Sequence, residues 1–114
     1  MKTILNLVIM LFCAVAFGQD QKVEYKKLDN DLVKVTYYYA DNSNLIEREG
    51  FFNDGKLHGT WVSYNIEGNT TTIANYVNGK KDGVWTYFKK DKVNVVTYKL
   101  NKIINVEEKA LAVN

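Results

Sequence analysis

The sequence predicts an all-β protein, an elongated, twisted antiparallel sheet built from tandem β-hairpins of about 24 residues each. Two observations lead to this fold class. A motif of glycine, lysine and aromatic residues recurs at a fixed spacing, and short runs rich in Val, Thr and aromatic residues alternate with Asp-Gly and Asn-Gly dipeptides. The chain of 114 residues is long enough for one small domain.

An internal repeat is the most informative feature. The segment 52–64 matches the segment 76–88 after a shift of 24 positions, so that aromatic, Gly, Lys, Gly, Trp and aromatic residues recur in step. The matched pairs are Phe52 and Tyr76, Gly55 and Gly79, Lys56 and Lys80, Gly59 and Gly83, Trp61 and Trp85, and Tyr64 and Phe88. Weaker copies flank the two clear ones, since Tyr37 precedes Trp61 by the same spacing. The repeat domain is therefore expected to span 33–106, with atypical terminal units.

About six strands are expected within this domain, each rich in β-branched and aromatic residues. They cover 33–40, 45–53, 60–65, 70–77, 84–89 and 93–100. The dipeptides Asp54-Gly55 and Asn78-Gly79 mark hairpin turns, because both central positions of a type I′ turn require positive φ. A second glycine follows four residues after the first in each motif, which predicts a connection longer than a two-residue turn.

The first eighteen residues have the layout of a secretory signal peptide. Lys2 gives a positive start, an apolar run covers 4–15, and the small residues Ala16 and Gly18 precede a cleavage site. The run is too short to cross a bilayer. The mature chain is therefore expected in the periplasm, in the cell envelope or outside the cell, without a transmembrane segment. A buried N-terminal helix or strand is the alternative interpretation of this run.

Cleavage would also change the composition of the chain. It would remove Cys13, the sole cysteine, and leave no disulfide, thiol nucleophile or thiolate metal ligand. Without Lys2, fourteen Lys and Arg stand against thirteen Asp and Glu, a net charge of +1. Such a balance predicts no nucleic-acid partner. The N-terminal segment 19–32 and the tail 107–114 follow no clear pattern, and the tail could close with a short helix or a last strand.

Neither a catalytic site nor a cofactor or metal site is expected. His58 is the single histidine and is expected to be an exposed turn residue, because a general base needs an orienting partner and a metal needs several ligands. Glu47 and Glu49 share a strand face, yet carboxylates at this spacing on an exposed strand are typical of a solvated surface. The chain is therefore not expected to be an enzyme.

Side-chain alternation divides the aromatic residues between two sheet faces. Trp61 and Trp85 are expected on the core face, where equivalent side chains of successive repeats stack. Tyr38, Tyr64 and Phe88 are the candidate anchors of an interaction face on the opposite side. Two interpretations stay open for these anchors. Lysine side chains, loops and the tail cover them, or they form an open aromatic strip that binds a partner.

The Gly-Lys-x-x-Gly-x-Trp-x-x-Tyr/Phe core of 55–64 and 79–88 resembles the MORN-variant repeat. That repeat occurs in many exported bacterial proteins and in a group labelled as antitoxin components of toxin–antitoxin pairs. The resemblance covers residues 36–100. It implies one hairpin per repeat, with the motif's glycines at tight turns and its aromatic residues stacked along the sheet.

Together these features favour a non-catalytic interaction module at the cell envelope or outside the cell. The expected partner is a protein or an envelope glycan, and self-association through a sheet edge or face is a further option. An antitoxin or immunity-type partner of a toxin or effector is one alternative function, and a carbohydrate-binding module is another. One repeat architecture hosts many functions, so the sequence leaves these alternatives open.

Overall fold

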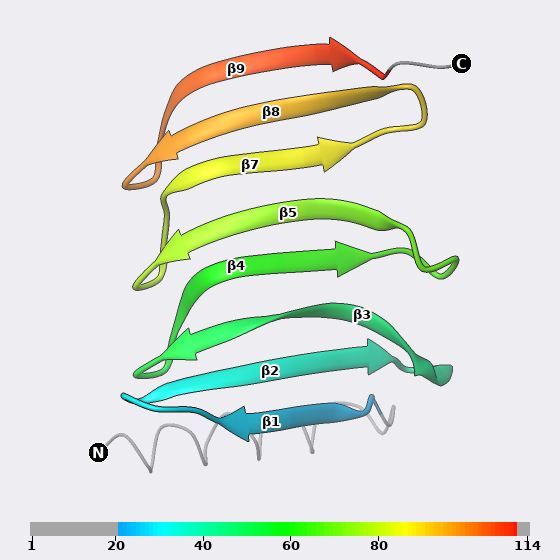
Figure 1. Ribbon diagram of the computed structural model, residues 1–114, viewed down its shortest axis with the longest axis vertical. Coiled ribbons are helices and arrows are strands. Elements are labelled where there is room, and N and C mark those ends of the chain that lie inside the picture. The colour runs from blue at the N-terminus through cyan, green and yellow to red at the C-terminus, as the bar shows by residue number, and fades with distance from the viewer. Residues whose placement is uncertain (1–20, 112–114) are drawn as a thin grey trace.

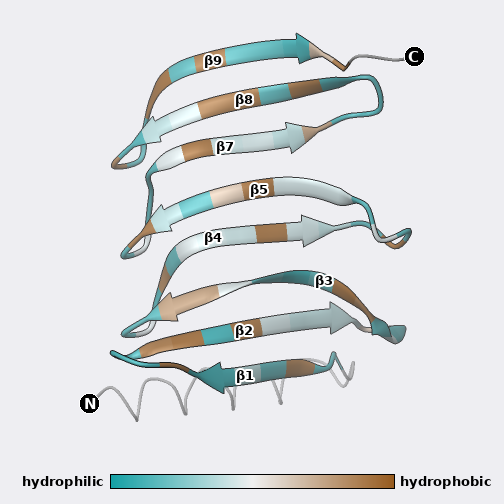
Figure 2. Ribbon diagram, in the orientation of Figure 1, coloured by the Kyte–Doolittle hydropathy of each residue, from teal (hydrophilic) through white to brown (hydrophobic). Residues whose placement is uncertain are grey.

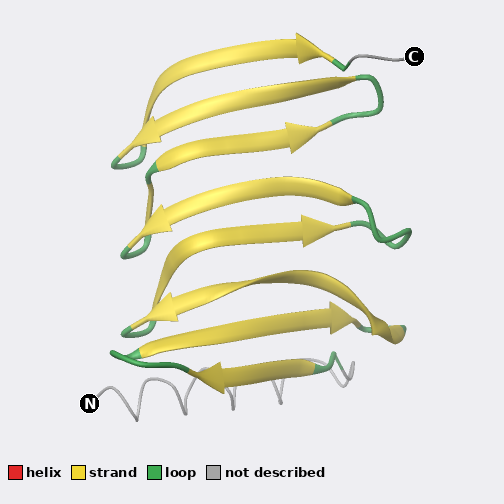
Figure 3. Cartoon of the chain, viewed as in Figure 1, coloured by secondary structure: helices red, strands yellow, loops and turns green. Residues whose placement is uncertain are grey.

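Every regular element in the described part of the chain is a β-strand. The computed structural model describes residues 21–111, which contain nine strands and no helix (Figure 1, Figure 3). The strands are β1 (Val23–Lys27), β2 (Leu32–Tyr39), β3 (Asn42–Asn53), β4 (Lys56–Tyr64), β5 (Thr70–Val77), β6 (Lys80–Lys81), β7 (Gly83–Phe88), β8 (Lys92–Lys99) and β9 (Lys102–Ala110). The predicted all-β fold class is confirmed. The expected signal segment, 1–18, lies outside the described residues.

The strands form one open antiparallel sheet in which neighbours in sequence are neighbours in space. Their order is β1-β2-β3-β4-β5-β7-β8-β9, and the two-residue β6 pairs with the end of β5. The molecule has extents of 47 × 33 × 25 Å, and the elongated sheet twists along its length (Figure 1). The connections from β1 to β2, β3 to β4, β5 to β7 and β8 to β9 lie on the left of the sheet in Figure 1, and the others lie on the right. Residues 21–111 include no helix that could span a membrane.

The predicted count of about six strands is too low. β1 lies inside the unassigned segment 19–32, and β9 continues past the predicted domain end to Ala110. Both are edge strands, and their charged residues break the apolar alternation by which buried strands are recognised. The sheet therefore extends beyond both ends of the predicted domain, 33–106.

The hairpin turns are shorter than predicted. Asp54 and Gly55 alone join β3 to β4, with φ of 53° and 79°. Asn78 and Gly79 form the equivalent turn after β5, with φ of 47° and 87°. The prediction of a longer connection is wrong, because the second glycine of each motif lies beyond the turn.

These second glycines, Gly59 and Gly83, also have positive φ, of 74° and 104°. Close to Gly59 the pairing of β3 with β4 shifts between Glu49 and Phe51. The extra residues stand on β4, as in a β-bulge that begins with a glycine of positive φ. Such a bulge increases the local twist of the sheet.

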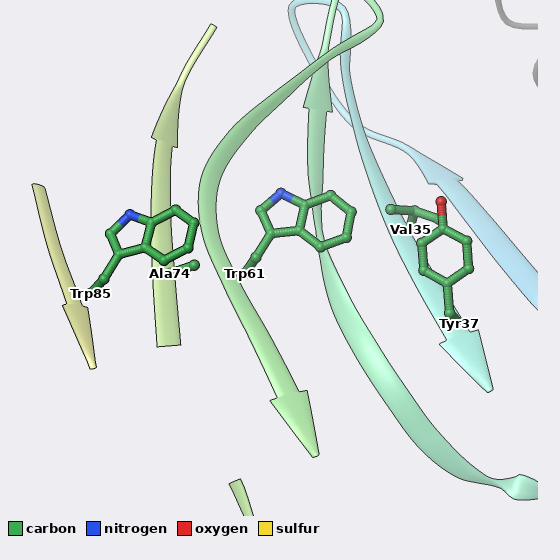
Figure 4. Close-up of a cluster of buried hydrophobic side chains, with 5 residues drawn as sticks. All are labelled: Val35, Tyr37, Trp61, Ala74 and Trp85. Carbon is green, nitrogen blue, oxygen red and sulfur yellow. The ribbon is translucent and has the colours of Figure 1, made fainter. Parts of the chain in front are cut away.

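The main cluster of buried hydrophobic side chains lies on one side of the sheet, which we call the core face. Its members are Val35, Tyr37, Trp61, Ala74 and Trp85 (Figure 4). Thr36 and Val93 are buried as well, on the opposite face. Tyr37 and the two tryptophans follow one another at intervals of 24 positions, on β2, β4 and β7. Each indole is only 6 % exposed. Short hydrophobic bands interrupt more hydrophilic stretches along the strands (Figure 2).

Equivalent residues of the two clear motifs make equivalent contacts. The Nε1 atom of Trp61 donates a hydrogen bond to the backbone oxygen of Phe51 at 3.0 Å. The Nε1 atom of Trp85 donates to the backbone oxygen of Asn75, 24 positions after Phe51, at 2.8 Å. A buried indole N–H needs such an acceptor. The motif therefore gives both indoles the same position over the first strand of their own hairpin.

Candidate interaction face

Seven aromatic rings cross the core face from β2 to β8, and we call them the aromatic strip. They are Tyr37, Phe52, Trp61, Tyr76, Trp85, Tyr87 and Tyr98. Ala74 lies between the two tryptophans and joins the two halves of the strip (Figure 4). The strip runs across the strands, so each hairpin contributes part of it.

The first half of the strip is centred on Trp61. Its ring centroid lies 6.3 Å from that of Tyr37 and 5.5 Å from that of Phe52, which meets the indole edge-on at 79°. The guanidinium carbon of Arg48 lies 4.3 Å from the ring centroid of Tyr37. A cation in this position is attracted by the negative face of the ring.

The second half is centred on Trp85. Its centroid lies 5.2 Å from that of Tyr76, 6.3 Å from that of Tyr87 and 5.3 Å from that of Tyr98. The Nζ atom of Lys81 lies 4.8 Å from the Trp85 centroid and 5.0 Å from the Tyr98 centroid. Burial raises the pKa of Tyr76 and of Tyr87.

No second layer of residues 21–111 covers the strip. Each pair of strands in substantial contact is a pair of neighbours in the sheet, and Figure 1 shows a single layer. The indoles are buried by the side chains around them, whereas Phe52, Tyr76, Tyr87 and Tyr98 are only partly buried. Most domains bury an apolar sheet face against another layer. An aromatic face without one is a candidate contact surface for another molecule.

A buried polar atom lies beside the strip. Asn94 pairs with Tyr87 in the sheet register and points to the core face. Its Oδ1 atom is buried and has no hydrogen-bond donor among residues 21–111. An acceptor buried in this way costs free energy unless a donor reaches it.

The three predicted anchors, Tyr38, Tyr64 and Phe88, lie on the opposite face, where β3 and β5 separate them from one another. The Tyr38 hydroxyl donates to Glu24 at 2.7 Å, and the Tyr64 hydroxyl donates to Glu49 at 2.8 Å. These hydrogen bonds are the main reason why the pKa of each of the two tyrosines is raised. The side chain of Phe88 is 38 % exposed. The structure brings the predicted anchors together less closely than the rings of the core face.

The two carboxylates singled out in the sequence are held by neighbouring side chains. Besides accepting from Tyr64, Glu49 lies 3.9 Å from the Nζ atom of Lys34. Glu47 accepts a hydrogen bond from Gln21 at 2.8 Å. Between residues 21 and 111, no group of three or more His, Cys, Asp or Glu side chains could hold a metal ion.

His58 lies within β4, so the expectation that it is a turn residue is wrong. Its Nδ1 atom accepts a hydrogen bond from the backbone N–H of Asn78 at 3.2 Å. Asp82, 24 positions later, accepts from the backbone N–H of Leu100 at 3.0 Å. Each of the two side chains therefore fastens its own hairpin to the turn of the next one.

Removing this link is expected to weaken the sheet modestly. His58→Ala takes away the acceptor of the Asn78 N–H and should lower the free energy of unfolding by about 0.5–1.5 kcal/mol. His58→Asp places at this position the acceptor that Asp82 supplies in the next hairpin, and should retain most of the stability. Urea unfolding of the three proteins measures the difference. Equal losses for both variants would show that the hydrogen bond does not stabilise the fold.

Three rings of the strip, Phe52, Tyr76 and Tyr98, were not singled out as site residues from the sequence, nor were the cations over its rings, Arg48 and Lys81. Phe52 and Tyr76 occupy matched positions of the repeat, so the signal was present. Because a long connection was assumed, the sequence did not show which residues of one strand point to the same sheet face as given residues of the strand before it. A two-residue turn fixes that relation, because it pairs Phe52 with Leu57 and so places Phe52 on the core face.

Comparison of the chain with models of known protein families, with curated proteins and with solved structures finds no match.

Proposed function

We propose that this protein is a non-catalytic, exported binding module that uses the aromatic strip to contact a protein partner. The observation that carries the proposal is the strip itself, seven rings on one face with no second layer of residues 21–111 over them. Contiguous apolar patches on soluble proteins mark interaction sites. Tyr, Trp and Arg, three of the residue types in and beside the strip, are enriched at protein interfaces.

The ring geometry favours a protein over a glycan. Sugar rings stack on aromatic faces that lie open and roughly parallel. Here no ring pair is parallel. Three pairs stand edge-on, with interplanar angles of 79° for Phe52 and Trp61, 68° for Tyr76 and Trp85, and 61° for Trp85 and Tyr98. The other two, Tyr37 with Trp61 and Trp85 with Tyr87, are tilted by 33° and 40°. The gaps between rings set at such angles suit apolar side chains of a protein surface better than they suit a flat sugar ring.

The polar groups beside the strip support the same choice. Arg48 covers one ring of the strip, Tyr37, and presents a cation to the partner. Lys81 covers two rings of the strip and would attract an acidic or carbonyl group of the partner. An apolar surface with a few polar positions of this kind is typical of specific protein interfaces.

Export and the kind of partner rest on the sequence. The layout of residues 1–18 supports export through a signal peptide. An antitoxin or immunity-type partner of a toxin or effector is one form that a protein-binding module would take, and the resemblance to the MORN-variant repeat supports it. An effector gene next to the gene for this chain would favour that form.

Capture of partners from native envelope and medium fractions tests the proposal with three baits. The first is the wild-type protein, the second carries Tyr87→Thr and Tyr98→Thr on the core face, and the third carries Tyr64→Thr and Phe88→Thr on the opposite face. Threonine suits a strand, so both variants are expected to retain the sheet, which circular dichroism checks.

A protein retained by the wild type and by the opposite-face variant, and lost from the core-face variant, is the expected result. Loss from the opposite-face variant alone would move the contact to the other side of the sheet. Retention of glycan rather than protein by folded baits would favour a carbohydrate-binding module instead.

A further inference from the structure

The C-terminal edge strand of the sheet is long and exposed, and it has three large apolar residues. β9 has nine residues, all of them exposed, and it pairs only with β8 among the described strands. Ile103, Ile104 and Val106 are 59 %, 62 % and 62 % exposed. An edge strand with these properties is a template for pairing with another strand, and soluble proteins normally protect such edges.

The opposite edge of the sheet does carry such protection. β1 has only five residues, and three of them are charged. Short edge strands with lysines are a common defence against unwanted pairing. β9 is nearly twice as long, and its four charged residues lie on either side of an apolar stretch that contains Ile103, Ile104 and Val106. Its length and this stretch single out β9 as the edge on which a partner strand would pair.

We propose that β9 pairs with β9 of a second copy of this chain, so that two sheets join into one through an antiparallel, two-fold symmetric contact. In such an isologous contact each copy uses the same edge strand, so the assembly is complete with two copies. The proposal concerns the sheet edge and does not depend on the partner of the aromatic strip.

The side chains of β9 are distributed so that this contact would bury its apolar residues. Ile103 pairs with Tyr98 and Val106 pairs with Val96, and both partners belong to the core face. The isoleucine and the valine therefore continue the apolar face beyond the last rings of the strip. A second β9 paired with the first would cover Ile103 and Val106 at the sheet edge. Ile103 and Val106 of the second copy would pack against them.

The register follows from the residues of β9. With Asn105 on the two-fold axis, Ile104 of one copy faces Val106 of the other. The pairing of β8 with β9 shifts at this point, and Ile104 is the residue without a partner on β8. If the bulge at Ile104 is kept in the dimer, Ile103 and Ile104 of one copy both lie opposite Val106 of the other. The next residue, Lys102, then lies opposite Glu107 of the second copy.

Charge complementarity supports this register. Lys102 and Glu107 lie on the same side of the sheet, since they pair with Lys99 and Val95 on β8. The two-fold axis creates this opposite-charge pair twice, and opposite charges on paired strands stabilise the contact. A register centred on Val106 would instead place Ile104 beside a glutamate, Glu108.

Sedimentation equilibrium of the purified protein tests the proposal. The wild type is expected to sediment with twice the mass of one chain. Lys102→Glu and Glu107→Lys each place like charges opposite each other twice and should raise the dimer dissociation constant about tenfold. The double variant Lys102→Glu/Glu107→Lys should dimerise like the wild type. Lys26→Glu, on the β1 edge, is the matched control and should leave the dissociation constant unchanged.

A monomeric wild type would overturn the proposal, and so would a dimer that neither charge reversal weakens. Failure of the double variant to recover would exclude the proposed register and with it the proposal. Ile104→Lys adds a test that does not rely on charge pairing, because it places a cation in the apolar centre of the contact and should abolish the dimer. A dimer that survives this substitution would likewise contradict the proposal.

Discussion

Replacing Trp61 with alanine is expected to lower the free energy of unfolding by about 3–5 kcal/mol. The indole is 6 % exposed, contacts the rings of Tyr37 and Phe52, and donates to a backbone oxygen. A small domain has a total stability of about 5–15 kcal/mol, so this loss would remove much of it. Urea unfolding followed by circular dichroism measures the effect.

Trp85→Ala provides the matched comparison. Its indole is buried to the same extent, and its hydrogen bond and edge-on ring contact are equivalent to those of Trp61. The two losses are therefore expected to agree within about 1 kcal/mol, because the two sites match in burial and in contacts. A loss below about 1 kcal/mol at either position would show that the single-layer core does not stabilise the sheet in the way described.

Substituting Gly50 with alanine is expected to destabilise the protein by about 1–3 kcal/mol, although it adds only a methyl group. Gly50 lies beneath the indole of Trp61. A Cβ atom at this position would lie 2.0 Å from the Cδ2 atom and 2.3 Å from the Cε2 atom of the ring. The indole would have to move away from its backbone acceptor, which costs packing and a hydrogen bond together. Thermal unfolding measures the loss.

A double-mutant cycle separates this clash from a general effect of the substitution. In a Trp61→Phe background the smaller ring leaves room for the methyl group, so Gly50→Ala is expected to cost clearly less than in the wild type. Gly50 does not have positive φ, so alanine at this position causes no backbone strain and the measured cost reports the clash with the indole. An equal cost of Gly50→Ala in both backgrounds would show that the indole does not occupy this position.

Much of the central sheet could be predicted from the sequence because its signals are local. The Asp-Gly and Asn-Gly turns demand positive φ, and alternation over β5 gave the bounds Thr70–Val77 that the structure has. The turn at Asn30 and Asp31, with φ of 60° and 65°, lacks glycine and escaped notice. The requirement for Gly50 was also invisible, because its equivalent 24 positions later is Ala74.

The candidate site was harder to predict because it depends on the register between strands. Tyr64 and Phe88 are matched positions of the motif, and nothing local distinguishes their face from that of Tyr76 and Tyr98. The sheet face on which a residue lies depends on the lengths of the turn and of the bulge that precede it. An error of one residue in either length moves every following side chain to the other face. Register is set by pairing between strands, which a single strand's composition does not specify.

Photo-crosslinking in intact cells tests most directly whether the aromatic strip is the contact surface. p-Benzoylphenylalanine is introduced at position 87 or 98 on the core face and, for comparison, at position 64 or 88 on the opposite face. The proposed function predicts an adduct with a protein of defined mass from positions 87 and 98 and none from the other two. Adducts from positions 64 and 88 alone, or from none of the four in a folded protein, would contradict it.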